Sequence, residues 1–193
     1  MDKSLQIRGA GQDKTHVFCD APDYVLKFAG EGSWTVEGLT LEHTGKLPAS
    51  VVLVEAGKFT AQGCKFTGGI RNQFSQQLGY GLDIRAADSI SISKCLVERN
   101  ERAGISVTGK NDGMYLIEGC TILQCELGIV VHAGKCRINK CSAEKCRDCG
   151  IAMTGFAVGE VEGCTVRGNA QHGIVLHHRA QATVKNCQAL NNG

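Results

Sequence analysis

Short stretches of alternating apolar and polar residues recur along the chain at nearly constant intervals. The clearest case is a shift of 23 positions between residues 150–169 and 173–192, which aligns Cys187 with Cys164. A fixed period of this size is typical of a solenoid, in which each unit packs only on its neighbours. The pattern therefore predicts one elongated repeat domain.

Each repeat keeps apolar residues at fixed offsets around one Cys or Leu position. The template reads apolar, any, apolar, any, any, Cys or Leu, any, apolar, as in residues 59–66. Seven repeats share it, and the central positions are separated by 25, 31, 25, 21, 23 and 23 residues. These positions are Leu39, Cys64, Cys95, Cys120, Cys141, Cys164 and Cys187. Alternation with a period of two predicts short β-strands, and no stretch has helical spacing.

Two further ladders follow the cysteine ladder. Gly followed by Ile or Leu opens a second short strand at residues 81–82, 104–105, 128–129, 150–151 and 173–174. We interpret glycine here as allowing a turn conformation that is barred to residues with a side chain. The position five residues after the cysteine holds Asn100, Cys125, Cys146, Asn169 and Asn192. Asn tolerates turn dihedrals and its amide can bond to the next coil, so this is predicted to be a structural turn position.

Two segments depart from the template. Residues 1–33 contain apolar alternations that fit it loosely, and we expect an irregular N-terminal coil or cap there. The longest spacing contains residues 69–78, which have no counterpart in other repeats and predict a loop inserted between strands. Such insertions often carry contacts, and a neutral surface loop is the alternative. We therefore expect a single domain over residues 1–193, regular over 34–193, within a larger protein.

These observations predict an all-β parallel solenoid of about seven to eight coils, each of 21–25 residues. The pattern G-I-x-V followed by I-x-x-C-x-V-x-x-N resembles the right-handed parallel β-helix of the pectate-lyase-like superfamily over residues 34–193. The resemblance implies the fold but not one activity, because the superfamily includes polysaccharide lyases, glycoside hydrolases, uronan epimerases and intracellular non-enzymatic helices. In its catalytic members, a sheet face commonly carries clustered acids and a Lys or Arg base.

Composition narrows the classes of partner. The 21 basic and 19 acidic residues give a net charge of +2 without a basic stripe, so we expect no nucleic-acid partner. No apolar run approaches the ~18 residues of a membrane span, and the first residues lack a signal-peptide pattern, so we expect no membrane partner. Eleven cysteines, six of them in one ladder, favour reduced core thiols and a cytoplasmic, reducing location. Cys19 has no place in the ladders.

Alternation places two columns of residues on the outer face of the glycine-led strands. The first contains Asp83, Ser106, Val130, Ala152 and Val175, and the second contains Arg85, Thr108, His132, Thr154 and His177. Calcium binding and glycoside hydrolysis both require more carboxylates than the single acid in these columns. We interpret Asp83 and Arg85 as an exposed ion pair, with a remnant of an enzymatic site as the alternative.

Two other patterns resemble metal sites. Residues 136–149 contain C-x4-C-x4-C-x2-C, but only the last two cysteines have the close spacing of a zinc knuckle. His132 and His177 are two coils apart, about 9.6 Å from the strand spacing, which is long for one metal ion. We therefore expect neither a metal ion nor another cofactor.

The sequence as a whole favours a non-catalytic binding or scaffold module that presents a flat sheet face to a protein or glycan partner. Candidate binding residues are Thr108, His132, Thr154, His177, Arg71, Phe74 and Tyr80. One alternative is a carbohydrate-active enzyme, a polysaccharide lyase or uronate epimerase, with Asp83, Arg85 and His177 as its catalytic residues. The other is a purely structural spacer. The open edge of the last coil would also allow end-to-end self-association.

Overall fold

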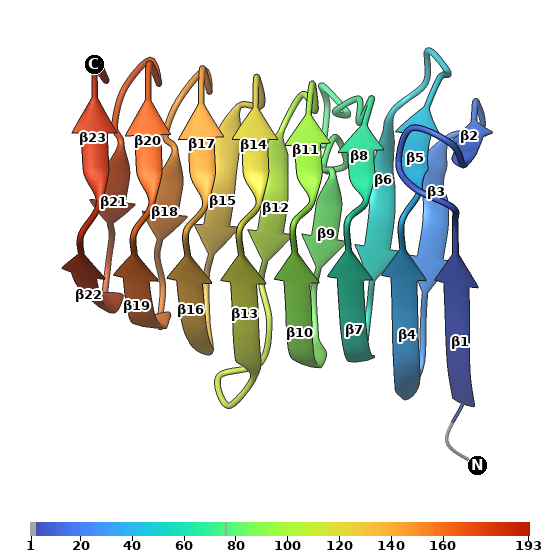
Figure 1. Ribbon diagram of the computed structural model, residues 1–193, viewed down its shortest axis with the longest axis horizontal. Helices are drawn as coiled ribbons and strands as arrows, with labels where there is room; N and C mark the ends of the chain where they lie inside the picture. The colour runs from blue at the N-terminus through green and yellow to red at the C-terminus, as the bar shows by residue number, and fades with distance from the viewer. Residues whose placement is uncertain (1–2, 76) are drawn as a thin grey trace.

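The computed structural model describes residues 3–75 and 77–193. They form a right-handed parallel β-solenoid of about seven coils, with three parallel sheets and no helix in the described part (Figure 1). The predicted all-β right-handed β-helix is therefore confirmed. Because the described residues contain no helix, none of them forms a long apolar helix of the kind that crosses a membrane.

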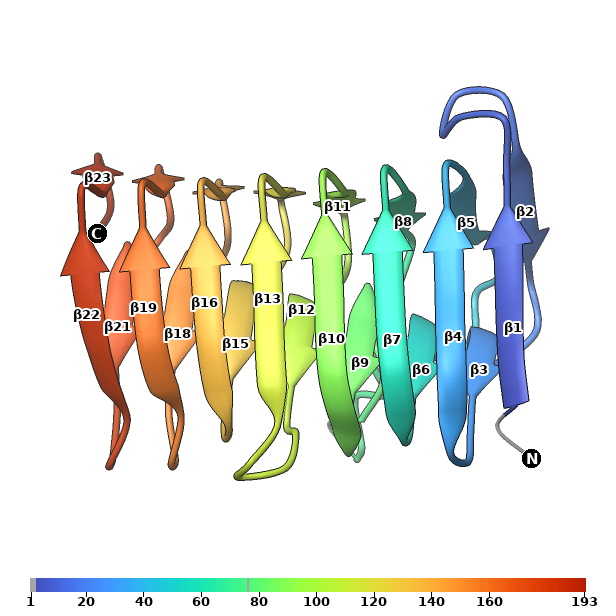
Figure 2. The ribbon, with the colours of Figure 1, turned by 60° about the horizontal axis from the view of Figure 1, so that its bottom comes forward.

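Each of the first seven coils contributes one strand to each of three sheets, which we call A, B and C, and the chain then adds β22 to sheet A and β23 to sheet B. Sheet A contains β1 (Lys3–Arg8), β4 (Gly32–Glu37), β7 (Gly57–Gln62), β10 (Ala87–Ser93), β13 (Met114–Glu118), β16 (Lys135–Asn139), β19 (Val158–Glu162) and β22 (Gln181–Lys185). Sheet B contains β2 (His16–Cys19), β5 (Thr40–His43), β8 (Lys65–Thr67), β11 (Leu96–Glu98), β14 (Thr121–Leu123), β17 (Ser142–Glu144), β20 (Thr165–Arg167) and β23 (Gln188–Leu190). Sheet C contains β3 (Asp23–Phe28), β6 (Ala49–Val54), β9 (Leu82–Ile84), β12 (Ala103–Val107), β15 (Leu127–Val131), β18 (Ile151–Met153) and β21 (Ile174–Leu176). Figure 2 shows the strands of sheet A side by side along the solenoid axis.

The core consists of apolar side chains that stack on one another from coil to coil. In sheet A, Ile92 pairs with Ile117 and Ile117 with Ile138, and all three side chains are fully buried. Successive strands lie about 4.8 Å apart, so each inward residue contacts its equivalents on both neighbouring coils. Period-two alternation turns the intervening residues outward, which explains why the repeat template alternates.

The predicted cysteine ladder lies at the corner between sheets A and B. Its members from Cys64 to Cys164 are buried, and each of the eleven cysteines of the chain is free. Five of the six ladder thiols donate to a carbonyl oxygen of the preceding coil, as Cys120 Sγ does to Ile92 at 3.6 Å, whereas Cys95 donates to Ser93 of its own coil. The ladder is therefore a stack of small buried side chains whose weak donors are satisfied by the backbone.

The Asn and Cys ladder lies at the corner between sheets B and C, where it links successive coils. Asn169 accepts a hydrogen bond from the Cys146 amide at 2.9 Å and donates one to the Ala143 carbonyl at 3.1 Å. Asn100 makes the equivalent bonds, accepting from the Gly69 amide at 2.9 Å and donating to the Phe66 carbonyl at 3.3 Å. This predicted structural role is confirmed.

The glycine ladder occurs for a different reason from the one we predicted. Gly104, Gly128 and Gly150 do not adopt the left-handed backbone conformation, so the turn explanation is wrong for them. A Cβ at Gly104 would lie 2.7 Å from Ile122 Cγ2, and one at Gly128 would overlap the carbonyl oxygen of Gly150. Glycine is therefore required by the close approach of one coil to the next.

The N-terminal segment is more regular than predicted. We expected an irregular coil or cap over residues 1–33, but strands β1 to β3 pair in parallel with β4 to β6 and place Leu5 opposite Trp34. Residues 1–2 lie outside the described part. The outward residue Phe18 of β2, which pairs with Glu42, is 71% exposed.

The insertion at residues 69–78 lies in the long connection between β8 and β9. It contains two isolated antiparallel bridges, Ala49 with Ile70 and Arg71 with Leu78. The Asn72 amide also donates to the Gln77 carbonyl at 2.9 Å, which closes a small hairpin within the loop. Residue 76 lies outside the described part. The loop therefore projects from the corner between sheets B and C.

Candidate functional site

Both predicted outer columns form on sheet C. Ser106 pairs with Asp83 on one side and with Val130 on the other, which builds the first column. The second column is held by backbone bonds between coils, such as those from the His132 amide to the Val107 carbonyl and from the Thr154 amide to the Val131 carbonyl. The outer face of sheet C thus carries the grid of side chains that the alternation predicted.

The three weak catalytic candidates do not share one site. Asp83 and Arg85 lie two residues apart at the end of β9, whereas His177 occupies the last coil of the same column. Four rungs of about 4.8 Å separate Arg85 from His177, or about 19 Å. A glycosidic bond cannot contact all three, so this arrangement offers no shared catalytic constellation.

The Asp83–Arg85 ion pair forms, but it is not exposed as we expected. Arg85 donates to Asp83 Oδ2 from Nη2 at 2.9 Å and from Nε at 3.1 Å, and its Nη2 also donates to the Tyr24 hydroxyl at 3.3 Å. The Asp83 side chain is only 5% exposed, against 44% for Arg85. Burial raises the pKa of Asp83, and the Arg85 guanidinium opposes that rise. Because Arg85 binds both Asp83 and Tyr24, we interpret this ion pair as a structural link between coils.

The remaining residues of the second column differ in their surroundings. His132 is half-buried, and burial, together with the Arg102 charge, lowers the pKa of its imidazole. Thr154 Oγ1 lies 2.8 Å from His178 Nδ1, and His177 is exposed. Thr108 is also exposed. These side chains form a polar strip rather than a cluster around one point.

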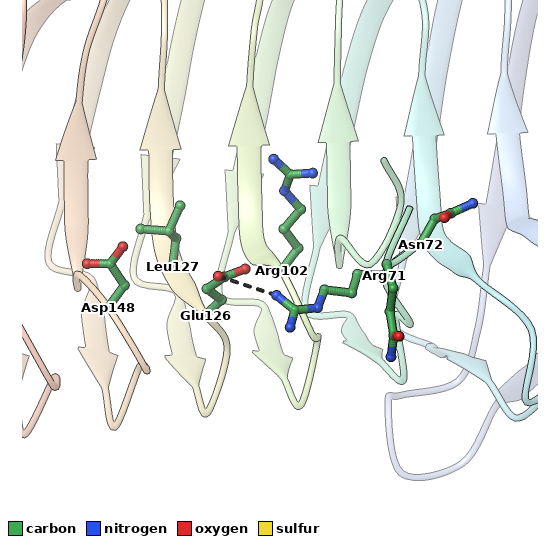
Figure 3. A pocket seen from close by; sticks show the side chains of 7 residues that line it. Arg71, Asn72, Arg102, Glu126, Leu127 and Asp148 are labelled. Atoms are coloured by element: carbon green, nitrogen blue, oxygen red, sulfur yellow. Dashed lines mark ion pairs between the residues drawn. The ribbon is translucent and has the colours of Figure 1, made fainter. Parts of the chain in front are cut away.

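A groove lies where the inserted loop meets the turns between sheets B and C (Figure 3). Its volume is about 520 Å³. The loop contributes Arg71, Asn72 and Gln73, and the turns contribute Arg102, Glu126, Leu127 and Asp148. The groove thus combines basic, acidic and amide side chains that come from four coils.

Three charged residues of the groove occupy equivalent positions on successive coils. The Glu126 amide donates to the Arg102 carbonyl at 2.8 Å, and the Asp148 amide donates to the Glu126 carbonyl at 2.9 Å. These bonds hold the three residues on a ladder with a spacing of about 4.8 Å per rung. The ladder changes from basic to acidic along the solenoid axis.

The loop is anchored to the groove through Arg71. Its Nη1 lies 3.6 Å from Glu126 Oε1, and its backbone amide donates to Glu101 Oε2 at 3.1 Å. Figure 3 shows Arg71 reaching from the loop towards Glu126. Phe74 lies at the tip of the loop and is fully exposed. Of the two loop residues predicted to bind a partner, Arg71 therefore lies in the groove, and Phe74 lies outside it.

Two charges in the groove lack an ionic partner among the described residues. The Arg102 guanidinium lies 5.2 Å from the centre of the Tyr80 ring, and no ion pair or hydrogen bond from it occurs in this part of the chain. The Asp148 carboxylate accepts only from the Cys149 thiol, at 3.0 Å. The Tyr80 side chain is half-buried under Arg102, and burial raises the pKa of its hydroxyl. Among residues 3–75 and 77–193, the groove therefore offers a ligand one cation and one anion that have no ionic partner.

Sequence reasoning missed Arg102, Glu126 and Asp148, because it followed the strand columns and not the turns. A signal was available, since these residues stand two positions before Gly104, Gly128 and Gly150. That offset defines a fourth ladder with its own charges. The ladder lines a groove only because the inserted loop, with Arg71, Asn72 and Gln73, lies beside it.

The cysteine run at residues 136–149 is spread over separate ladders. Cys136 and Cys141 are core residues, Cys146 is in the turn ladder, and Cys149 bonds to Asp148. Across residues 3–75 and 77–193, no three His, Cys, Asp or Glu side chains gather in a way that could hold a metal ion.

Comparison with known proteins gives one match. A family model described as "Right handed beta helix region" matches residues 49–193, which is more than half of the chain. Comparisons with curated proteins and with solved structures gave no match. The matched residues include the inserted loop, the groove and both outer columns. On this evidence, the chain belongs to the right-handed β-helix family.

Proposed function

We propose that this protein is a non-catalytic binding module that holds a polypeptide segment of a partner in the groove beside the inserted loop. The observation that carries this proposal is the loop itself. Residues 69–78 interrupt an otherwise regular array and enclose a polar groove whose Arg102 and Asp148 lack ionic partners among the described residues. A partner would extend from the groove onto the outer face of sheet C, where Thr108, His132, Thr154 and His177 are candidate contacts.

Rigidity is the physical basis of the proposed binding. The turn residues Arg102, Glu126 and Asp148 have amides that bond to the preceding coil, so their backbone positions are set before a partner arrives. A preformed site loses little conformational entropy on binding, which leaves more of the interaction free energy for affinity. The solenoid would therefore act as a fixed frame for a flexible segment.

The lining of the groove favours a polypeptide over a glycan. Sugar-binding sites commonly use an open aromatic face, but the face of Tyr80 is covered by Arg102. Opposite charges on neighbouring rungs match the mixed acidic and basic side chains of a protein segment. Binding of glycans alone in the groove would therefore contradict the proposal.

A carbohydrate-active enzyme, such as a polysaccharide lyase or uronate epimerase, is the second candidate. One observation favours it, because Glu126 and Asp148 occupy neighbouring rungs. Two carboxyl side chains on rungs about 4.8 Å apart could supply a general acid and a general base to a bound uronate. Against it, Glu126 is paired with Arg71 and Asp83 is held by Arg85.

Arrays of random-sequence peptides and of glycans would test the proposal. The wild-type protein is compared with the double variant Arg102→Gln/Asp148→Asn, and with the control Lys58→Gln/Asp112→Asn on other exposed surfaces. We expect peptide binding that the control retains and the groove variant loses at least tenfold, with equal thermal melts by circular dichroism.

Three results would contradict this function. Peptide binding that is unchanged in the groove variant would place the site elsewhere, and an absence of peptide binding would remove the proposed partner class. Groove-dependent binding of glycans alone would assign the other class. Turnover of a uronate panel with calcium, abolished by Glu126→Gln, would establish the enzyme.

A further inference from the structure

The backbone of the groove cannot recognise a partner by adding a strand. The amides of Glu126 and Asp148 already donate to carbonyl oxygens of the preceding coil. Strand addition requires a free row of backbone donors and acceptors, and the amides of this turn ladder are already used between coils. Recognition in the groove must therefore come from side chains, above all from Arg102 and Asp148.

The spacing of these two charges is set by the coils. Arg102 and Asp148 are two rungs apart, about 9.6 Å between equivalent backbone positions. An extended chain in the polyproline II conformation has three residues per turn and a rise of about 3.1 Å, so residues i and i+3 face the same side about 9.3 Å apart. A fully extended β-strand would turn residues i and i+3 to opposite sides.

The floor between the two charges is partly apolar. Leu127 lines the groove and packs against a small cluster of Ala103, Val130 and Ala152 on the outer face of sheet C. Glu126, between Arg102 and Asp148 on the ladder, is already paired with Arg71. The two residues of a bound segment that lie between its charged side chains would therefore face the Arg71–Glu126 pair and Leu127. Small or apolar side chains suit this floor.

We propose that the groove selects an extended polypeptide segment in which an acidic and a basic residue are separated by two small or apolar residues. The acidic side chain binds Arg102 and the basic side chain binds Asp148. Arg102 is suited to this role because a guanidinium can bind a carboxylate through two parallel hydrogen bonds, and its stacking on Tyr80 limits its freedom. This inference rests on the proposed function and specifies its partner chemistry.

Synthetic peptides of fixed length test the spacing. Each carries one glutamate and one arginine separated by zero, two or four alanines, with Gly-Ser flanks and a fluorescent label, and binding is measured by anisotropy at low salt. We expect the two-alanine peptide to bind at least fivefold more tightly than the other two. Its Kd should rise with NaCl, because exposed charge pairs are screened. Equal Kd values for all three spacings would overturn the inference.

Double-mutant cycles test the assignment of each charge. Arg102→Gln is combined with replacement of the peptide glutamate by glutamine, and Asp148→Asn with replacement of the peptide arginine by glutamine. Each matched cycle should show coupling of at least threefold in Kd, and the crossed cycles should show none. Lys58→Gln and Asp112→Asn serve as controls with the same changes of charge.

The outcomes separate this inference from the function on which it rests. If the variant Arg102→Gln/Asp148→Asn weakens peptide binding but the matched cycles show no coupling, the inference fails and the proposed function stands. If no peptide binds, or if groove variants leave binding unchanged, both fail. Coupling in both matched cycles, together with the two-residue spacing, would establish the inference.

Discussion

The amide ladder at the corner between sheets B and C provides a quantitative test of how the coils are joined. Asn169 is 1% exposed, and its side chain bonds to the Cys146 amide, the Ala143 carbonyl and Asn192 Oδ1. The substitution Asn169→Ala would leave the buried Cys146 amide without an acceptor, whereas the Ala143 carbonyl stays within the parallel ladder of β17 and β20. A buried backbone group without a partner costs roughly 1–3 kcal/mol, so this substitution should lower the free energy of unfolding by about 2 kcal/mol.

Urea unfolding followed by far-UV circular dichroism measures this loss. With an m-value of about 3 kcal/mol/M, the midpoint should fall by about 0.7 M. Asn139→Ala is the matched control, because Asn139 makes one bond to a side chain, Glu118, and is partly exposed. Its midpoint should change by no more than about 0.2 M, corresponding to about 0.5 kcal/mol for a surface substitution.

Trp34 in β4 adds a second signal from the other end of the solenoid. Neighbouring coils interact directly and distant coils do not, so unfolding near Asn169 can precede unfolding near Trp34. Equal midpoints for Asn169→Ala and Asn139→Ala would refute the reasoning, because the buried amide would then contribute no more than an exposed one.

Three further predictions concern the thiols, the glycine ladder and the buried ion pair. Burial raises the pKa of the Cys136 thiol to about 11 and that of Cys146 to about 12. The folded state therefore favours the protonated thiols, and their contribution to the free energy of unfolding should be complete below pH 9 and lost as pH rises towards 12. A urea midpoint that stays constant from pH 9 to 11 would contradict this prediction. Gly128→Ala should lower the melting temperature more than Gly119→Ala, because the first creates a clash between coils and the second only places alanine at a φ of 59°; the reverse order would be inconsistent with close approach as the cause. Arg85→Ala should destabilise the fold at pH 7 and raise the pKa of Asp83 further, because the buried carboxylate loses its cation. Stability should be partly recovered as pH falls through that pKa. An unchanged titration of the Asp83 carboxyl by NMR would mean that Arg85 does not hold Asp83.

The repeat template predicted the architecture closely, and its physical basis is simple. Parallel in-register stacking places equivalent residues of successive coils in contact, so the same demand for an apolar, small or amide side chain recurs at each coil. Cys120 and Cys141 could therefore be placed in the core, and Asn169 in the turn, from their offsets alone. The same regularity placed Ser106 and His132 on the outer face of sheet C.

The glycine ladder shows where offsets identify a position but not its cause. Gly128 was correctly singled out, yet its role was assigned to a turn conformation. The real constraint is the carbonyl oxygen of Gly150 on the next coil, and a contact between coils cannot be read from the local sequence. The burial of Asp83 was missed for a similar reason, since neighbouring coils and long side chains cover an outward position.

The sequence by itself thus determined the fold, the three structural ladders and the presence of an inserted loop at residues 69–78, because each follows from a periodic local pattern. Only the tertiary structure decided where a candidate site lies. Arg102, Glu126 and Asp148 are separated by more than twenty residues from one another and by more than twenty from Arg71. Their shared offset from the glycine ladder places them on neighbouring coils, but only the folded structure shows that the inserted loop lies beside those coils and makes a groove with them.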